Sequence, residues 1–405
     1  MKLGPFLRLN APWLAAGGLL TFLSSFGQTF FISIFAGEIR SEFGLSHGEW
    51  GGIYSLGTTT SAIVMIWAGA LTDRFRVRGL GALILLALAG ACIAMASVKA
   101  AWALVFVIFA LRFTGQGMTS HIAVVAMARW FVATRGRALA IATLGFSVGE
   151  ALLPVLFVAL MAFVDWRVLW IIAAIIALAG IPVLSLLLRN ERTPQSMAHE
   201  NPSLGMFGRH WTRNQTLRHP LFWFMVPALL GPSAFGTALF FHQVHYAEIK
   251  GWEHVQLVSL FPLYTLFGIG SRLISGWALD RFGTPRLMPF FQLPMVLAFV
   301  AFGMTTSISG ALIGFFFMAL TTGANSTLPN AFWAEFYGTQ NIGSIKAMAA
   351  AVMVFGSAIG PGITGVLIDL GMGWDTQMVA IAAYFVLTTV MMTVGITRYK
   401  TALIA

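Results

Sequence analysis

Long apolar runs separated by short charged stretches are the feature that most constrains this chain. Of its 405 residues, 24 are basic and 14 acidic, so 9% are charged, whereas a typical soluble domain has about 25%. The hydrophobic fraction is 58% and the mean hydropathy is +0.83. A water-soluble globule of this size needs more polar surface. The composition therefore excludes a soluble enzyme, a disordered chain and a secreted domain, and only a lipid bilayer suits the chain as solvent.

The apolar runs predict twelve membrane-spanning helices, because crossing the hydrocarbon core takes about 20 apolar residues. The runs are too long and too continuous for the alternating pattern of an outer-membrane barrel. The expected fold class is an all-α polytopic membrane protein. The predicted helices cover residues 12–36, 49–72, 79–98, 101–129, 138–163, 168–188, 220–246, 256–280, 287–306, 309–334, 345–369 and 376–397.

The basic residues predict the orientation of these helices. If both termini and the polar segment 189–219 lie in the cytoplasm, most of the basic residues fall on the inner side. Only Arg40, Lys99, Arg167 and Lys250 then lie outside. Positive loops favour the cytoplasmic side, so we expect both termini to be cytoplasmic. The compact loops favour an integral plasma membrane protein of a bacterial inner membrane. This topology accounts for the net charge of +10 without nucleic-acid binding.

An internal repeat divides the chain into two halves. The segment Gly69-Ala-Leu-Thr-Asp73-Arg74 after the second predicted helix returns as Gly276-Trp-Ala-Leu-Asp280-Arg281 after the eighth. Gly145 and Gly149 in the fifth helix are likewise echoed by Gly356 and Gly360 in the eleventh. Two halves with one plan are typical of secondary transporters. We expect an N-terminal six-helix bundle over residues 1–188, a cytoplasmic linker over 189–219 and a C-terminal six-helix bundle over 220–405.

At these loop segments the chain resembles the major facilitator superfamily, whose loop motif is Gly-x-x-x-Asp-Arg-x-Gly followed by basic residues. The resemblance implies two six-helix bundles that rock about a central cavity. Contacts of the motif would latch the cytoplasmic side, although such charges can also be ordinary interfacial residues. Arg76 stands where the family prefers glycine. The predicted cytoplasmic gate consists of Gly69, Asp73, Arg74 and Arg78 in the first copy and Gly276, Asp280, Arg281 and Gly283 in the second.

Three ionisable residues, Arg112, Glu150 and Arg272, lie within predicted helices, where a charge costs a few kcal/mol unless it faces a partner or a cavity. Arg112 and Glu150 are equally far from the turn between the fourth and fifth helices, so they share a depth in the membrane. This spacing predicts an ion pair. The pair either couples transport to protons, with Glu150 as proton carrier, or is a static bridge.

Arg272 has no acidic residue near it in its own helix, and a guanidinium presents a planar fork that matches a carboxylate. It therefore suits an anionic ligand, although backbone carbonyls could also hold it. Its position before the second loop motif resembles monocarboxylate transporters and oxalate–formate antiporters. The helix-1 motif of monocarboxylate transporters is absent, since the chain has Ser24-Ser25-Phe26-Gly27-Gln28 there.

Other polar residues in the helices complete the predicted sites. They could line a substrate cavity or form hydrogen bonds between helices. The candidates for substrate binding are Arg272, Gln28, Tyr54, Tyr264 and Asn325. His242 and His245, near the outer end of the seventh helix, are a possible outer gate. They lack a third ligand, so we expect no metal.

These features predict a secondary active transporter that works by alternating access, not an enzyme. The favoured substrate is a small organic anion, a monocarboxylate, moved by proton symport or exchange. A proton-coupled exporter of hydrophobic compounds is the alternative, and a non-transporting membrane receptor is a more remote one. The expected partners are the substrate, protons and the lipid bilayer, with no cofactor and no nucleic acid, and we expect a monomer.

Overall fold

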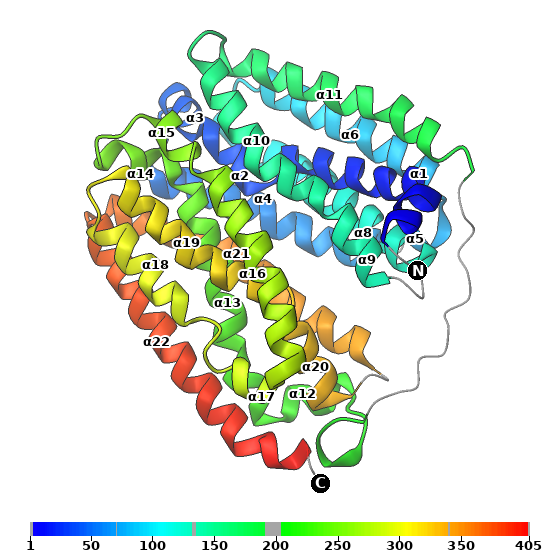
Figure 1. Ribbon diagram of the computed structural model, residues 1–405. Coiled ribbons are helices and arrows are strands. Elements are labelled where there is room, and N and C mark those ends of the chain that lie inside the picture. Colours follow the sequence, from blue (N-terminus) through cyan, green and yellow to red (C-terminus); the bar gives the residue numbers. More distant parts are fainter. Residues whose placement is uncertain (1–2, 70, 132–134, 191–203, 339–340, 404–405) are drawn as a thin grey trace. The chain divides into compact units, whose positions relative to one another are not determined.

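The computed structural model describes residues 3–69, 71–131, 135–190, 204–338 and 341–403. All regular secondary structure in these residues is helical. The chain divides into two compact units, Met1–His199 and Glu200–Ala405. Their boundary falls inside the predicted linker, of which residues 191–203 lie outside the described residues. Each unit is described by itself (Figure 1).

The first unit forms its six expected spans from several interrupted helices. The breaks fall mainly in the first, fourth and fifth spans. The α-helices are α1 (Leu3–Leu23), α2 (Thr29–Ile32), α3 (Ala36–Phe43), α4 (His47–Ala68), α5 (Leu71–Arg74), α6 (Val77–Ser97), α7 (Leu104–Leu111), α8 (Ser120–Trp130), α9 (Arg135–Ala142), α10 (Leu144–Met161) and α11 (Trp166–Leu187). The 3₁₀ segments are η1 (Ser24–Gly27), η2 (Ser33–Phe35) and η3 (Ala101–Ala103), and η4 (Arg112–Thr119) is a π-helix.

The second unit has fewer interruptions. Its α-helices are α12 (Arg213–Arg218), α13 (Pro220–Phe241), α14 (Gln243–Ile249), α15 (His254–Val258), α16 (Phe261–Phe282), α17 (Thr284–Leu287), α18 (Leu293–Met304), α19 (Ile308–Asn325), α20 (Leu328–Tyr337), α21 (Ile342–Asp369) and α22 (Trp374–Tyr399). The 3₁₀ segments are η6 (Met206–Gly208) and η7 (Lys400–Leu403).

Ten helical segments of the described residues are long and apolar enough to cross a membrane. The other two predicted spans correspond to α4, which has 22 residues, and to α18, which has only 12. The ninth span was predicted to begin at residue 287, but α18 begins at Leu293. Tight turns precede it, with Phe290 N donating to Leu287 O and Leu293 N to Phe290 O. Pro289 and Pro294 lack the N–H that a longer helix would need there.

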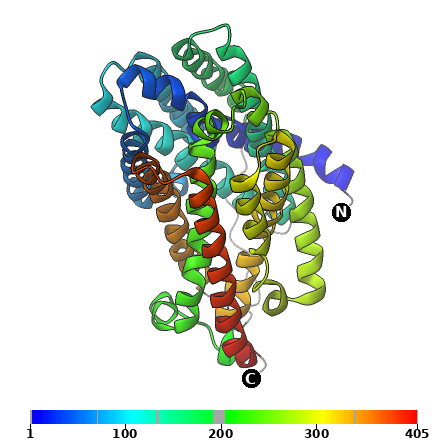
Figure 2. The ribbon, with the colours of Figure 1, turned by 90° about the vertical axis from the view of Figure 1, so that its left-hand side faces the viewer.

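The same three helix pairs pack most extensively in each unit. In the first unit they are α1 with α10, α4 with α7, and α6 with α11; in the second they are α13 with α21, α16 with α19, and α18 with α22. Figure 1 shows α6 and α11 side by side, and Figure 2 shows α22 (red) beside α13 (green), a further neighbour. The sequence repeat is therefore a repeat of packing.

The repeated glycines, Gly145 and Gly149 in the first unit and Gly356 and Gly360 in the second, lie at one of these interfaces. A Cβ on Gly145 would lie 2.8 Å from the carbonyl carbon of Gly18, and one on Gly149 would lie 2.9 Å from Ser25 Cβ, so α10 presses directly on the first span. In the second unit, a Cβ on Gly356 would lie 2.8 Å from Leu230 O of α13. Both glycine pairs thus allow the fifth helix of a half to approach its first.

An ion pair also recurs at one end of each unit. In the first unit, Arg167 at the start of α11 pairs with Glu42 of α3. In the second, Asp375 at the start of α22 pairs with Lys250 after α14, at 2.9 Å. Each bridge ties the last span of a unit to the segment that follows its first span. Arg167 and Lys250 are two of the few basic residues that the charge pattern places outside.

Substituting Gly145 by alanine tests the close packing of α10 on α1. The new Cβ would overlap the Gly18 carbonyl, and overpacking of this kind typically costs about 1–3 kcal/mol, so the melting temperature should fall. Thermal unfolding in one detergent measures it. The matched control is Gly90→Ala in α6, where a Cβ meets no atom within 4 Å and the melting temperature should hold or rise. Equal melting temperatures would contradict the packing.

Candidate functional site

The first span of the chain is broken where it is fully buried. α1 ends at Leu23, a 3₁₀ turn covers Ser24–Gly27, and Gln28 is extended with φ −88° and ψ 153° before α2 begins. Aromatic rings pack around the break, with the Phe31 centroid 5.1 Å from that of Phe26 and 4.8 Å from that of Phe157. A break frees backbone carbonyls, which inside a membrane protein must find donors.

A second irregular segment crosses this break. The fourth span changes to a π-helix over Arg112–Thr119, a rare geometry that is frequent at functional sites. A Cβ on Gly27 would lie 2.7 Å from Gly115 Cα, and one on Gly115 would lie 2.6 Å from Gly27 Cα. The backbones of η1 and η4 therefore touch, and only glycine fits on either side.

Arg112 binds the broken backbone directly. Its side chain is buried, with 1% of its surface exposed, and Nη1 donates to Gly27 O at 3.1 Å and to Thr29 Oγ1 at 3.3 Å. The Thr29 hydroxyl in turn shares a 2.5 Å hydrogen bond with the Tyr54 hydroxyl. The guanidinium carbon lies 5.3 Å from the centre of the Tyr54 ring, within the range of a cation–π interaction. Arg112 thus joins the first, second and fourth spans.

The predicted ion pair between Arg112 and Glu150 is not formed in the described part of the chain, where the polar partners of Arg112 are Gly27, Thr29 and Tyr54. Equal distance from a helical turn fixes the depth of two residues but not the faces on which they lie. Glu150 is half-buried on α10, directly after Gly149, which packs on Ser25 of the break. Arg112 and Glu150 therefore lie beside the same break on different helices.

The candidate ligands of the first unit lie at this break. Gln28 is its extended residue and is buried, with 8% exposed. Tyr54 is wholly buried and reaches the break through Thr29 and Arg112. Sequence reasoning missed the roles of Thr29, Gly27 and Gly115. The polar and small residues between Ser24 and Thr29 were the available signal, because they interrupt an otherwise apolar helix.

Arg272 has a different environment in the second unit. It lies in the middle of α16, is half-buried, and its Nε is buried without a hydrogen-bond partner among the described residues. A Cβ on Gly323 of α19 would lie 2.5 Å from Gly268 O and 2.8 Å from Arg272 N, so the two helices cross at this arginine. The Ser271 hydroxyl fastens the crossing by donating to Leu320 O at 2.6 Å.

The glycines on α16 do not all serve close packing. A Cβ on Gly268, Gly270 or Gly276 would meet no atom within 4 Å, whereas the tight contact is made by Gly323 of α19. The backbone of α16 does approach α19 closely, but the glycine that permits the contact lies on α19. Open space lies beside these glycines, on the helix that carries Arg272.

Two other predicted ligands lie at the same helix crossing. Tyr264 is buried two turns before Arg272, and its hydroxyl donates to Thr322 Oγ1 at 3.3 Å. Asn325 is half-buried and ends α19, two residues after Gly323. Contacts between α16 and α19 thus gather Tyr264, Arg272 and Asn325 at one crossing within the second unit.

The predicted gate residues are only partly described. The side chains of Asp73 and Asp280 lie outside the described part of the structure, and Arg74, Arg78 and Arg281 are exposed. Gly69 ends α4 beside His121, whose Nε2 would lie 3.3 Å from a Cβ at Gly69. Gly283 has φ +73°, a left-handed conformation that favours glycine, whereas Arg76 at the matching position has φ −70°. The first loop therefore tolerates arginine.

The two predicted outer-gate histidines have partners inside the second unit. His242 is buried at the break between α13 and α14, and its Nε2 lies 2.9 Å from Pro361 O of α21. His245 is half-buried, with its ring 6.0 Å from that of Trp374 at the start of α22. His242 thus marks a break in the seventh span, between α13 and α14.

A bundle of apolar, membrane-length helices, with one arginine buried at a broken span and another half-buried within a span, fits one class, an integral membrane transporter. The sequence profile of the Major Facilitator Superfamily matches residues 17–361, and the chain belongs to this family. It is accordingly a secondary transporter that works by alternating access and not an enzyme, with the twelve-helix fold of the family.

Solved structures share this fold at low sequence identity. The chain is similar to a bacterial homologue of the human lysosomal transporter Spinster in its inward-facing, unoccupied conformation, with 16% identity, a TM-score of 0.74, and coverage of 97% of this chain and 98% of that one. It is also similar to the nucleoside transporter NupG, with 13% identity, a TM-score of 0.71, and coverage of 96% and 98%. No curated protein matches the sequence. These likenesses establish the fold and leave the substrate open.

Replacing Arg112 by methionine tests its role as the anchor of the break. The Gly27 carbonyl would lose its donor, and an unsatisfied buried polar group costs about 1–3 kcal/mol, so the melting temperature should fall clearly. Tyr54→Phe should cost less, because it removes the hydrogen bond with Thr29 but leaves the Gly27 carbonyl its donor. Arg8→Met, an exposed arginine of α1, is the matched control. An Arg112→Met protein as stable as this control would refute the anchor.

Proposed function

We propose that the chain transports a small organic anion, a monocarboxylate, and that Arg272 binds the carboxylate group. The observation that carries this proposal is the contrast between Arg112 and Arg272, the two arginines within the spans. The guanidinium of Arg112 is held by a backbone carbonyl and a hydroxyl. The Nε of each arginine lacks a partner, but no side-chain hydrogen bond of Arg272 is found among the described residues, and the glycines beside it leave open space.

The physical reason is the cost of a charge away from water. A guanidinium in a membrane protein needs hydrogen-bond acceptors with charge or strong dipoles. A carboxylate supplies both, in a geometry that the arginine fork matches with two hydrogen bonds. Tyr264 and Asn325, at the same helix crossing, would then contact the rest of the substrate. Gln28 and Tyr54 would contribute from the first unit.

Proton symport or exchange is the second part of the proposal. Glu150 is half-buried next to Gly149, whose backbone packs on the break that Arg112 holds from the other side. Its charge would therefore act on the most irregular part of the first unit, without a direct ion pair to Arg112. We assign Glu150 as the proton carrier and Arg112 as the residue that holds the break.

The proposal also covers the oligomeric state, the topology and the two gates. The transporter would act as a monomer in a bacterial inner membrane, with both termini and the linker 189–219 in the cytoplasm. Asp73, Arg74, Asp280 and Arg281 would form the inner gate, with Gly69, Arg78, Gly276 and Gly283 around them. His242 and His245 would contribute to the outer gate, since His242 lies at a break in the seventh span.

Thermal-shift measurements with small carboxylates test the role of Arg272. A ligand at 100 times its dissociation constant stabilises a protein by about 2.7 kcal/mol. A carboxylate should raise the melting temperature of the wild type and of the control Arg398→Gln, an exposed arginine of α22, but not that of Arg272→Gln. Equal shifts in all three proteins would remove Arg272 from the site. Shifts with hydrophobic compounds alone, in all three proteins, would favour the exporter.

Transport by Glu150→Gln in proteoliposomes tests the coupling. The neutral amide cannot release a proton, so uptake driven by a pH gradient should be lost while exchange of labelled for unlabelled substrate continues. Glu248→Gln, an exposed residue of α14, should behave as the wild type. If Glu150→Gln still accumulated substrate in response to the gradient, the proton would have to travel by another group.

A further inference from the structure

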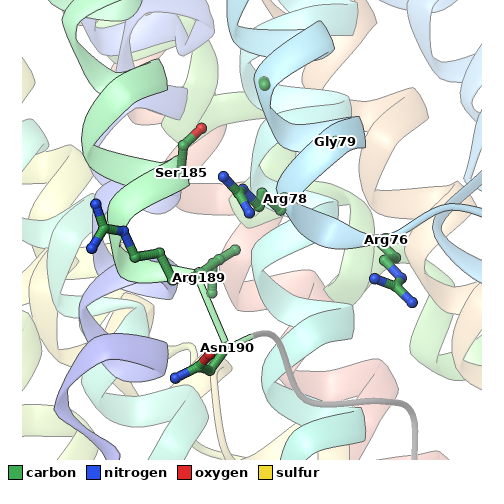
Figure 3. A pocket seen from close by; sticks show the side chains of 8 residues that line it. Arg76, Arg78, Gly79, Ser185, Arg189 and Asn190 are labelled. Carbon is green, nitrogen blue, oxygen red and sulfur yellow. The ribbon is translucent and has the colours of Figure 1, made fainter.

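A pocket of about 440 Å³ lies between the start of α6 and the end of α11 in the first unit (Figure 3). Arg76 and Arg78 reach it from the α6 side, and Arg189 and Asn190 follow the end of α11. Ser185, in the last turn of α11, lies between them. In Figure 3, Arg78 extends from α6 toward α11. The proposed transport cycle uses one residue of this lining, Arg78 of the proposed gate, and assigns no role to the pocket itself.

Packing fixes the walls of the pocket. A Cβ on Gly81 would lie 2.7 Å from Leu184 Cδ2, so α6 and α11 are in tight contact one turn away from the pocket. The indole Nε1 of Trp13 in α1 donates to Asn190 O at 2.9 Å, which holds the chain after α11 in place. Arg76 is the N-cap residue of α6 with an ordinary backbone conformation. The arginines therefore project from a rigid frame.

The chemistry of the pocket favours an oxyanion. Three of its eight lining residues are arginines and none is acidic. The pocket lies near the positive end of the α6 dipole and the negative end of the α11 dipole, and these two contributions oppose each other. The guanidinium groups therefore determine the sign of the electrostatic potential in the pocket. Arg76, Arg78 and Arg189 all line the pocket, so a bound anion with several oxygens can accept hydrogen bonds from more than one guanidinium. Arginine pairs with phosphate through two parallel hydrogen bonds, and Ser185 and Asn190 add neutral donors.

The position of the pocket identifies the level at which it meets the membrane. It lies where one candidate span, Val77–Ser97, begins and another, Trp166–Leu187, ends. The ends of membrane spans lie near the lipid headgroups, and basic pockets between spanning helices can hold anionic headgroups. We propose that this pocket binds a phosphate group, supplied by an anionic phospholipid headgroup or by free phosphate.

The test compares full-length variants in detergent micelles to which lipid is added. Phosphatidylglycerol should raise the melting temperature of the wild type. Each of Arg76→Gln and Arg189→Gln should weaken the apparent lipid affinity about fivefold, since one arginine near an anionic membrane surface contributes about 1 kcal/mol. Arg213→Gln, an exposed arginine of α12 that does not line the pocket, is the matched control and should respond as the wild type. Arg189→Lys keeps the charge and should retain most of the response.

Two further arms separate the sources of phosphate. Inorganic phosphate, compared with chloride at equal ionic strength, should give the same variant pattern only if free phosphate also fills the pocket. Phosphatidylcholine should act weakly, because its choline cation is repelled by the arginines. A phosphatidylglycerol response of equal size in the wild type, Arg76→Gln and Arg189→Gln would overturn the proposal. The proposal would also be overturned if Arg213→Gln lost the phosphatidylglycerol response to the same extent as Arg76→Gln and Arg189→Gln.

Discussion

One interaction organises the first unit, the hydrogen bond from Arg112 to the carbonyl of Gly27 at the broken first span. A break in a buried helix leaves carbonyls without donors, and in a membrane there is no water to supply them. Arg112 provides the donor, but it can reach the carbonyl only because Gly27 and Gly115 bring the two backbones into contact. The break, the π-helix, the glycine crossing and the arginine therefore depend on one another.

The two arginines within the spans show how similar residues can serve different purposes. The Nη1 of Arg112 donates two hydrogen bonds to the protein, and the side chain is almost completely buried. Arg272 is only half-buried and lies between glycines whose neighbourhood is open. An arginine that donates hydrogen bonds to other parts of the protein can hold the structure together. An arginine without such acceptors can bind a ligand. The hydrogen-bond partners of the side chain, more than its charge, therefore distinguish an anchor from a candidate binding residue.

The sequence predicted the class of fold well, because the length and spacing of apolar runs are set directly by the thickness of the bilayer. The glycine echoes also marked real contacts, since only glycine fits where Gly145 meets Gly18. The pairing of Arg112 with Glu150 was wrong because symmetry about a turn gives depth and says nothing of helix rotation. The role of Thr29 was missed, since a hydroxyl in an apolar run does not reveal which distant residue it will meet.

Arg76 marks a position at which the two copies of the loop motif differ. The two halves share their helix pairs, their glycine contacts and an ion pair between corresponding elements. Yet Gly283 needs a positive φ while Arg76 does not, so the first loop was free to carry a large charged side chain. That side chain lines the same pocket as Arg189, a residue outside the motif altogether. The backbone conformation decides which positions of a duplicated motif must keep glycine. A position without a positive φ can carry another side chain, and with it a binding function that the matching glycine cannot provide.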